Sequence, residues 1–328
     1  MSGRLRLCAL AAGVAALALA GLMIGQLPLG LRGIWDGLTG EGDLSALVLG
    51  TIRGPRVAAA LLVGAALGLS GMLFQTLFRN PLAAPDILGF TSGAGLAILL
   101  VTAAGLALPV PLAAAAGGLI AALAVVAIAH RRGQVVAPLT LVLVGLGVGF
   151  VTSAASGFVM TVLPPQDAAE AMRWLTGSLN ATNWGHVRLL LAGLAVLGLA
   201  AAVQLRLLQA LDLGEELAAG LGLRVGRARL SVAGAGVLLA ALAVSVAGPV
   251  PFIALMAGPL GARLAGASGL GPRMIAALLT GAGILVGADL LARAALPGLG
   301  LPAGVVTGLL GAPYLLWRLS REMGKGNL

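Results

Sequence analysis

Few side chains in this sequence could carry out nucleophilic, acid–base or metal chemistry. Cys8 is the only cysteine, and His130 and His186 are the only histidines. Metal sites and catalytic triads need several such groups brought together, and no HExxH motif is present. A P-loop needs a GxxxxGK sequence followed by Ser or Thr, but the sole lysine, Lys325, is followed by Gly326. We therefore expect no enzymatic activity, no metal and no cofactor in this chain.

The overall composition places the chain in a membrane. Of its 328 residues, 59% are hydrophobic and only 9% are charged, whereas soluble domains average about 25% charged residues. So few charges cannot cover a surface that faces water, which excludes a soluble fold. The net charge of +9 does not indicate nucleic-acid binding, because the basic residues form no patch with interleaved aromatic residues.

Ten apolar segments are predicted to cross the lipid bilayer as helices, each of which needs about 20 apolar residues. Pro109 and Pro111 divide one long apolar run, and a GPVP turn at 248–251 divides another. One segment, 252–265, is short for a span, so nine spans is the alternative. We expect an all-α polytopic membrane protein with a single transmembrane domain over residues 1–328. The predicted spans are 8–28, 57–78, 87–107, 111–130, 138–163, 189–208, 230–247, 252–265, 274–293 and 303–319.

The first predicted span has a second interpretation. Arg4 and Arg6 precede an apolar stretch that contains an ALA sequence at 18–20, as in a cleavable secretory signal. The apolar run continues to Gly30, which is longer than the core of a typical signal. We therefore expect the span to be retained.

The basic residues predict the orientation of the spans. With ten spans both termini lie on one side, and the loops of that side hold 14 of the 20 Lys and Arg residues. Cytoplasmic loops carry an excess of basic residues. We therefore expect a multi-pass protein of the bacterial inner membrane with both termini in the cytoplasm.

The eleven acidic residues discriminate between two kinds of transporter. An ion-coupled carrier usually keeps ionisable side chains deep in the membrane, but all eleven are predicted to lie at or beyond the ends of spans. Asp289, the closest to a span interior, lies one turn before Arg293 and should pair with it. We therefore expect ATP hydrolysis by a separate subunit to supply the energy. The alternative is a secondary transporter whose coupling ion is held by backbone carbonyls at broken helices.

One segment between the sixth and seventh predicted spans is suited to hold an ATPase subunit. The sequence LDLGEELAAGLGL at 211–223 predicts a short helix from about Gly214 that ends at Gly220, with two acidic residues in the first turn, where the helix dipole favours them. Its apolar side chains could enter a groove on another protein, and the alternative is a solvated connector in the loop 211–229. The expected contact residues are Leu213, Gly214, Glu215, Glu216, Leu217, Ala218, Leu221, Gly222 and Leu223.

Four groups of residues together resemble the FecCD family, the permease subunits of ATP-binding-cassette (ABC) importers for iron–siderophore complexes, haem and vitamin B12. The first group combines RGPR at 53–56 with QTLFRNPLAAPDILGFTSGA at 75–94, and the second is the 213–223 loop. The third is Gly248-Pro249 with Phe252, and the fourth joins ADLLAR at 288–293 to LPAG at 301–304 and GAP at 311–313. The residues of the most specific motif are Gln75, Asn80, Pro81, Leu82, Ala83, Pro85, Gly89, Ser92 and Gly93.

The resemblance implies a fold and a set of partners. The fold would be the ten-helix permease fold of these importers, carrying an iron–siderophore-type chelate inward, with vitamin B12 or haem as the alternative cargo. The chain would work with a second permease copy or paralogue, two cytoplasmic ATPase subunits that bind ATP and Mg²⁺, and an extracytoplasmic substrate-binding protein.

The resemblance also implies roles for individual residues. The 213–223 loop would press on the ATPase, and Arg53, Arg56 and Arg293 would dock the binding protein. The transport pathway would run between the two permeases along the fifth and tenth spans. The residues Thr152, Ser153, Ser156 and Thr307 are candidates for lining it.

Two departures from the family pattern affect these expectations. Gly258 and Pro259 stand where the family commonly has Pro-His or Pro-Gln. The sequence therefore does not predict the local backbone geometry of the eighth span. Gly300 replaces an acidic residue often found before the LPAG sequence and is expected to weaken docking.

Overall fold

The computed structural model describes residues 3–25, 27–39, 43–129, 138–294 and 301–323, and within these ranges it contains helices and no strands. His130 and Gly300 lie outside the described residues. The elements are α1 (Gly3–Met23), α2 (Leu31–Thr39), α3 (Asp43–Leu47), the π-helix η1 (Val48–Arg53), α4 (Gly54–Leu77), the 3₁₀ turn η2 (Pro85–Leu88), α5 (Phe90–Ala103), α6 (Val110–Ala129), α7 (Pro138–Val162), α8 (Pro165–Leu175), α9 (Trp184–Val203), α10 (Leu205–Leu213), α11 (Glu215–Gly220), α12 (Val225–Ala247), α13 (Ile253–Ala265), α14 (Leu270–Ala294) and α15 (Ala303–Met323).

Each of the ten predicted spans corresponds to a helix, which confirms the all-α polytopic class. Seven helical segments among the described residues are long and apolar enough to cross a membrane. Two more predicted spans are the shorter apolar helices α5 and α13, and the tenth is α15 with its 21 residues. Several helices begin up to five residues before the predicted span, among them α1, α9 and α12. In α9, which begins at Trp184 rather than at 189, the Asn183 side chain caps the helix by accepting a hydrogen bond from the His186 backbone N–H.

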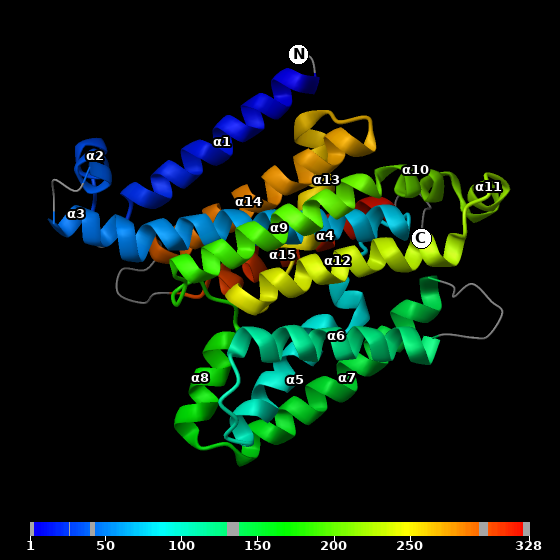
Figure 1. Cartoon of the computed structure of the whole chain (residues 1–328), viewed down its shortest axis with the longest axis horizontal. Helices are drawn as coiled ribbons and strands as arrows, with labels where there is room; N and C mark the ends of the chain where they lie inside the picture. Colours follow the sequence, from blue (N-terminus) through cyan, green and yellow to red (C-terminus); the bar gives the residue numbers. More distant parts are fainter. Residues whose placement is uncertain (1–2, 26, 40–42, 130–137, 295–300, 324–328) are drawn as a thin grey trace.

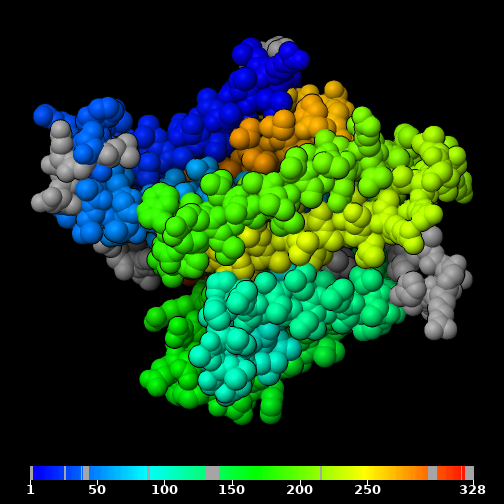
Figure 2. Space-filling model, in the orientation of Figure 1, coloured from blue at the N-terminus to red at the C-terminus, as the bar shows by residue number. Residues whose placement is uncertain are grey.

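The helices form two packed groups (Figure 1). A larger group contains α1, α4, α9 and α12–α15, while α5–α8 form a smaller layer beneath it. The smaller layer is joined to the larger group chiefly where α6 packs against α12. In the space-filling view the two groups meet along this line as one continuous body (Figure 2). The short helices α10 and α11 lie together at one end of the bundle, and α2 and α3 lie at the opposite end.

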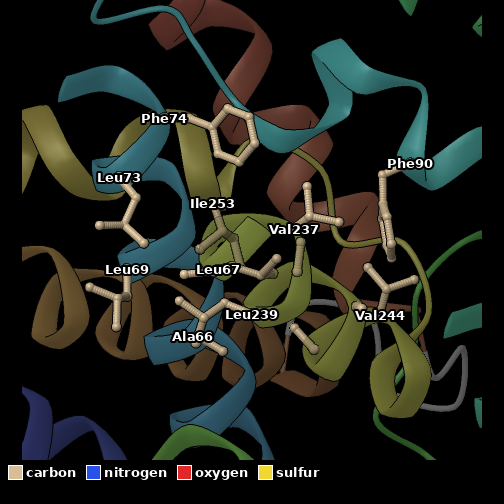
Figure 3. Packing of buried hydrophobic residues seen from close by; sticks show 14 of the residues in the cluster. Ala66, Leu67, Leu69, Leu73, Phe74, Phe90, Val237, Leu239, Val244 and Ile253 are labelled. Atoms are coloured by element: carbon tan, nitrogen blue, oxygen red, sulfur yellow. The ribbon is translucent and has the colours of Figure 1, made fainter. Parts of the chain in front are cut away.

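The centre of the larger group is α4, which packs against α9, α12, α13 and α14. Most of its side chains are buried, and Leu69, Leu73 and Phe74 are almost completely so. Figure 3 shows these side chains together with Leu239 of α12 and Ile253 of α13, which belong to the same buried cluster. A central helix that is apolar on all sides is typical of a helix surrounded by other helices.

Glycines let α4 and α14 approach to backbone contact. A Cβ atom on Gly64 would overlap the carbonyl oxygen of Gly281, and a Cβ on Gly281 would overlap that of Gly64. One turn along, a Cβ on Gly68 would overlap the carbonyl oxygen of Ala277. Such small-residue contacts drive helix association in lipid, where the hydrophobic effect between helices is absent. Gly64 and Gly68 therefore let α4 pack directly on the backbone of α14.

This contact predicts that Gly281→Ala destabilises the protein. The added methyl group must push α4 and α14 apart, and overpacking of this kind costs about 1–3 kcal/mol. Gly287→Ala is the matched control on the same helix, because a Cβ there has no atom within 4 Å, and alanine favours the helix by up to about 1 kcal/mol. Thermal unfolding of the detergent-purified chain measures both. Equal melting temperatures for the two variants would contradict the prediction.

Candidate functional site

The motif residues after α4 shape the turn that leads into α5. Arg79 adopts a left-handed conformation with φ of 48°. The Asn80 side-chain oxygen then accepts the Leu82 backbone N–H at 2.8 Å, closing an Asx turn. Gly89 has φ of 64°, and its carbonyl oxygen accepts the Ser92 hydroxyl at 3.0 Å, which stabilises the first turn of α5. The polar residues of the motif therefore hold backbone geometry.

The apolar motif residues fit this segment against the bundle. Ala83 is buried, and a Cβ on Gly93 would overlap the Ala121 side chain, so Gly93 lets α5 pack closely on α6. Leu82 and Pro85 line a cavity inside the bundle, and Pro81 lines a second one near the α11 end.

The first cavity has a volume of about 350 Å³ and contains an acidic side chain. It lies between the 82–91 segment, α4, α7, α12 and the turn before α13. Asp86 lines it together with apolar side chains that include Leu67 and Val244, and the Thr91 hydroxyl donates to the Asp86 carboxylate. Asp86 itself is exposed, although it lines this cavity.

Asp86 lies in the 3₁₀ turn η2, directly before α5 begins at Phe90. This agrees with its predicted place at the end of a span.

Gln75 supplies the hydrogen-bond donor that α13 lacks at Pro259, one of the two residues that depart from the family pattern there. Pro259 lies inside α13 and has no N–H to donate to the Leu255 carbonyl one turn before it. The Gln75 amide of α4 donates instead to the carbonyl oxygens of Leu255, at 3.0 Å, and Ala254, at 3.2 Å. A Cβ on Gly258 would overlap the Gln75 side-chain oxygen. Gln75, Gly258 and Pro259 therefore form one arrangement that keeps α13 continuous.

Asp289 forms ion pairs with two arginines at the end of the bundle opposite α11. Its carboxylate pairs with Arg56 at 2.7 Å and with Arg293 at 3.1 Å, which confirms the predicted i,i+4 pair and adds a partner from α4. Asp289 is 1% exposed, and Arg56 and Arg293 are 14% and 13% exposed. A buried carboxylate is tolerated because hydrogen-bonded cations surround it.

Arg53 and Arg293 also cap the C-terminal end of α1. Arg53 is 5% exposed and donates to the carbonyl oxygens of Leu22, at 3.0 Å, and Met23, at 3.2 Å. Arg293 donates to the carbonyl oxygen of Gly21 at 3.2 Å. The last carbonyls of a helix lack intrahelical donors, so both arginines satisfy groups that would otherwise be unpaired. The exposed arginines at this end are others, Arg32, Arg173 and Arg188.

The predicted coupling segment forms two short helices, α10 and α11, joined at Gly214. Gly214 has φ of 118°, and α11 spans Glu215–Gly220, close to the predicted helix. Leu213, Leu217 and Leu221, spaced four residues apart, are 60%, 61% and 70% exposed. Ala218 is fully buried. Exposed apolar side chains grouped outside the spans are typical of a surface that contacts another protein.

The candidate pathway residues differ in their surroundings. Ser153 is exposed on α7. Thr152 and Ser156 on the same helix donate to backbone carbonyls one turn earlier, those of Val148 and Thr152, at 2.9 and 2.8 Å. Thr307 on α15 is fully buried and donates to the Gly304 carbonyl at 3.0 Å.

The part of the chain that the structure describes holds no group of three or more His, Cys, Asp or Glu side chains placed to bind a metal ion.

Comparisons with known proteins identify a family and relatives of this chain. Residues 13–321 match the model of the FecCD transport family. The chain is 38% identical to the achromobactin transport system permease protein CbrC of Dickeya dadantii, over 94% of this chain and 89% of that one. It is 35% identical to the ferric enterobactin transport system permease protein FepG of Escherichia coli, over 93% and 92%. A solved structure described as an inward-facing conformation of a putative metal-chelate type ABC transporter superimposes with a TM-score of 0.84 at 25% identity, over 96% and 98%.

The Gln75 arrangement predicts a measurable coupling between two helices. Gln75→Leu leaves the Leu255 carbonyl without its donor, and a buried unsatisfied acceptor costs about 1–3 kcal/mol. Pro259→Ala restores the N–H that Leu255 lacks, so Gln75→Leu should cost less in that background, with a coupling energy of at least about 0.5 kcal/mol.

A double-mutant cycle by thermal or denaturant unfolding measures this coupling. Thr76→Val is the control, because the Thr76 hydroxyl bonds Met72 within its own helix, at 2.9 Å. Strict additivity of the Gln75 and Pro259 substitutions would contradict the arrangement.

Proposed function

This chain belongs to the FecCD transport family, and we propose that it is the transmembrane permease subunit of an ABC importer that moves an iron–siderophore-type chelate into the cytoplasm. Two relatives that it covers almost end to end are named as permeases for achromobactin and ferric enterobactin, which supports this class of cargo. The similarity to a metal-chelate type ABC transporter extends over 96% of the chain. The permease itself supplies a gated path, and its partners supply energy and substrate.

The observation that carries the energy-coupling part of the proposal is the row of exposed leucines at Leu213, Leu217 and Leu221. The row lies outside the spans, so lipid does not cover it. Burying a leucine against a partner contributes about 1.5–3 kcal/mol, which suits a stable contact. Two ATPase subunits that bind ATP and Mg²⁺ would press on this segment in two permease copies or paralogues.

The same contact sets the orientation. If α11 meets a cytoplasmic ATPase, then the α11 end of the bundle faces the cytoplasm and so do both termini. The distribution of basic residues, 14 of 20 on this side, supports the same orientation in the inner membrane.

The substrate-binding protein would dock at the opposite end. There the Arg56–Asp289–Arg293 cluster, with Arg53 beside it, has more cations than anions. Because these three arginines are largely occupied by internal partners, their main contribution is to hold the end of α1 and the start of α4 in register. The exposed Arg32, Arg173 and Arg188 would provide the accessible charge that steers an acidic partner.

The pathway would run between the two permeases along α7 and α15. Both helices expose large apolar side chains, such as Phe150 and Phe158 on α7 and Leu309 and Leu316 on α15. Ser153 is the exposed hydroxyl among the four candidate lining residues, while Thr152, Ser156 and Thr307 would shape the helices that border the path.

The coupling proposal predicts that the double variant Leu217→Ser and Leu221→Ser binds the ATPase at least about 100-fold more weakly, because two buried leucines each contribute about 1.5–3 kcal/mol. Affinity is measured between the ATPase and the permease in nanodiscs, together with the stimulation of ATP hydrolysis. The fold should remain intact, since both side chains are exposed.

Leu106→Ser with Leu108→Ser is the matched control. These two leucines are 55% and 51% exposed in the α5–α6 connection, away from α11. If the control weakened ATPase binding as much as the coupling variant, the assignment of α11 as the contact would be wrong.

A further inference from the structure

The short helix α2 carries two large apolar side chains that no described part of the chain covers. Leu31 and Trp35 are 65% and 66% exposed. They are four residues apart on α2 and therefore share one face of the helix. Large apolar side chains are unfavourable in water, so we expect this face to meet another apolar medium.

A second face of α2 packs against the protein. Ile34 is buried. A Cβ on Gly37 would overlap the side chain of Leu49 in η1 and the carbonyl oxygen of Ser45 in α3. The exposure of the apolar face is therefore not a sign that α2 is detached from the bundle.

A third face of α2 is polar. Arg32 is exposed and Asp36 is half-buried. Each of them follows directly after a member of the apolar face, and one residue turns an α-helix by about 100°. The charged side chains therefore point to one side of the helix while Leu31 and Trp35 point to another, as in an amphipathic helix at a membrane surface.

The apolar face of α2 follows the lipid-facing surface of α1 along the chain. α1 is long and apolar enough to cross a membrane, and little of its apolar stretch is buried inside the protein. Leu19 and Ile24 are exposed near its C-terminal end, and Leu27 is 50% exposed in the connection to α2. Residues 7–31 contain no charged side chain. The exposed surface therefore stays apolar from the span up to the first residue of α2.

The position of α2 favours lipid over a protein partner as the cover. α2 lies beside α1, on the side of the molecule away from α7 (Figure 1), and α7 borders the proposed path between two permeases. In the space-filling view α2 forms part of the outer edge of the molecule (Figure 2). Tryptophan is enriched at the level of lipid headgroups, and a neighbouring arginine can extend its charged end from there into water.

We propose that α2 lies in the surface of the lipid leaflet at the end of the bundle opposite α11, with Leu31 and Trp35 among the upper acyl chains. Arg32 and Asp36 then face water, which leaves the Arg32 charge accessible. Helices in this position bury their apolar face about 5–10 Å into the boundary between headgroups and acyl chains. Because α2 packs against α1 and η1, the anchored helix holds the ends of both at the membrane surface.

Spin-label accessibility of the full-length chain in phospholipid vesicles tests this placement. Cys8→Ser removes the only cysteine, and single labels are then attached through Leu31→Cys or Trp35→Cys. Arg32→Cys and Asp36→Cys are the matched controls, each one residue further along the same helix. The ratio of relaxation by oxygen, which enters lipid, to relaxation by a water-soluble nickel chelate should be at least about threefold higher at the two apolar positions.

Two results would overturn the proposal. Equal accessibility of all four labels to the nickel chelate would place the whole of α2 in water. Shielding of the labels at Leu31 and Trp35 from both oxygen and nickel would show that protein, such as a second copy of this chain, covers the face.

Fluorescence provides a second measurement that needs no cysteine variant. The emission that wild type has and Trp35→Phe lacks belongs to Trp35. In vesicles of a lipid brominated in the upper part of its acyl chains, this emission should fall at least about twofold relative to unbrominated lipid. Unchanged emission would show that Trp35 does not contact the acyl chains and would contradict the placement.

Discussion

The structure depends on one constraint: inside the bilayer each backbone carbonyl that a helix end or a proline frees must find a donor within the protein. Gln75 supplies the donor for the Leu255 carbonyl that Pro259 leaves open. Arg53 and Arg293 do the same for the last turn of α1. In each case a polar side chain from one helix completes the backbone of another, and the helices are thereby fixed relative to each other.

This constraint explains why residues that resemble functional motifs are so often structural. Asn80, Gly89 and Ser92 shape the connection that leads from α4 into α5. At the opposite end, Arg56 and Arg293 pair with Asp289. Arg53 and Arg293 also donate to the last carbonyls of α1. The surfaces that we propose for partners include the exposed leucines around α11 and the exposed faces of α7 and α15. A rigid scaffold with a few exposed contact surfaces is suited to a permease that other subunits drive.

The spans, the α11 helix and the Asp289–Arg293 pair could be predicted from the sequence, because each depends on composition or on neighbours within one turn. The features that were missed depend on distant segments. The pairing of Gln75 with Leu255 and the burial of Arg53 arise only when α4 packs against α13 and α1. Long-range contacts of this kind leave no periodicity in a single sequence.

The central claim is that this chain is a path through the membrane whose transport is driven by a separate ATPase. Uptake of a radioactive ferric chelate into sealed proteoliposomes tests it most directly, with the permease alone under a proton or sodium gradient and with the permease assembled with its ATPase, binding protein and ATP. The account predicts concentrative uptake only in the assembled, ATP-supplied vesicles. Uptake by the chain alone that collapses with the ion gradient would contradict it and identify a secondary transporter instead.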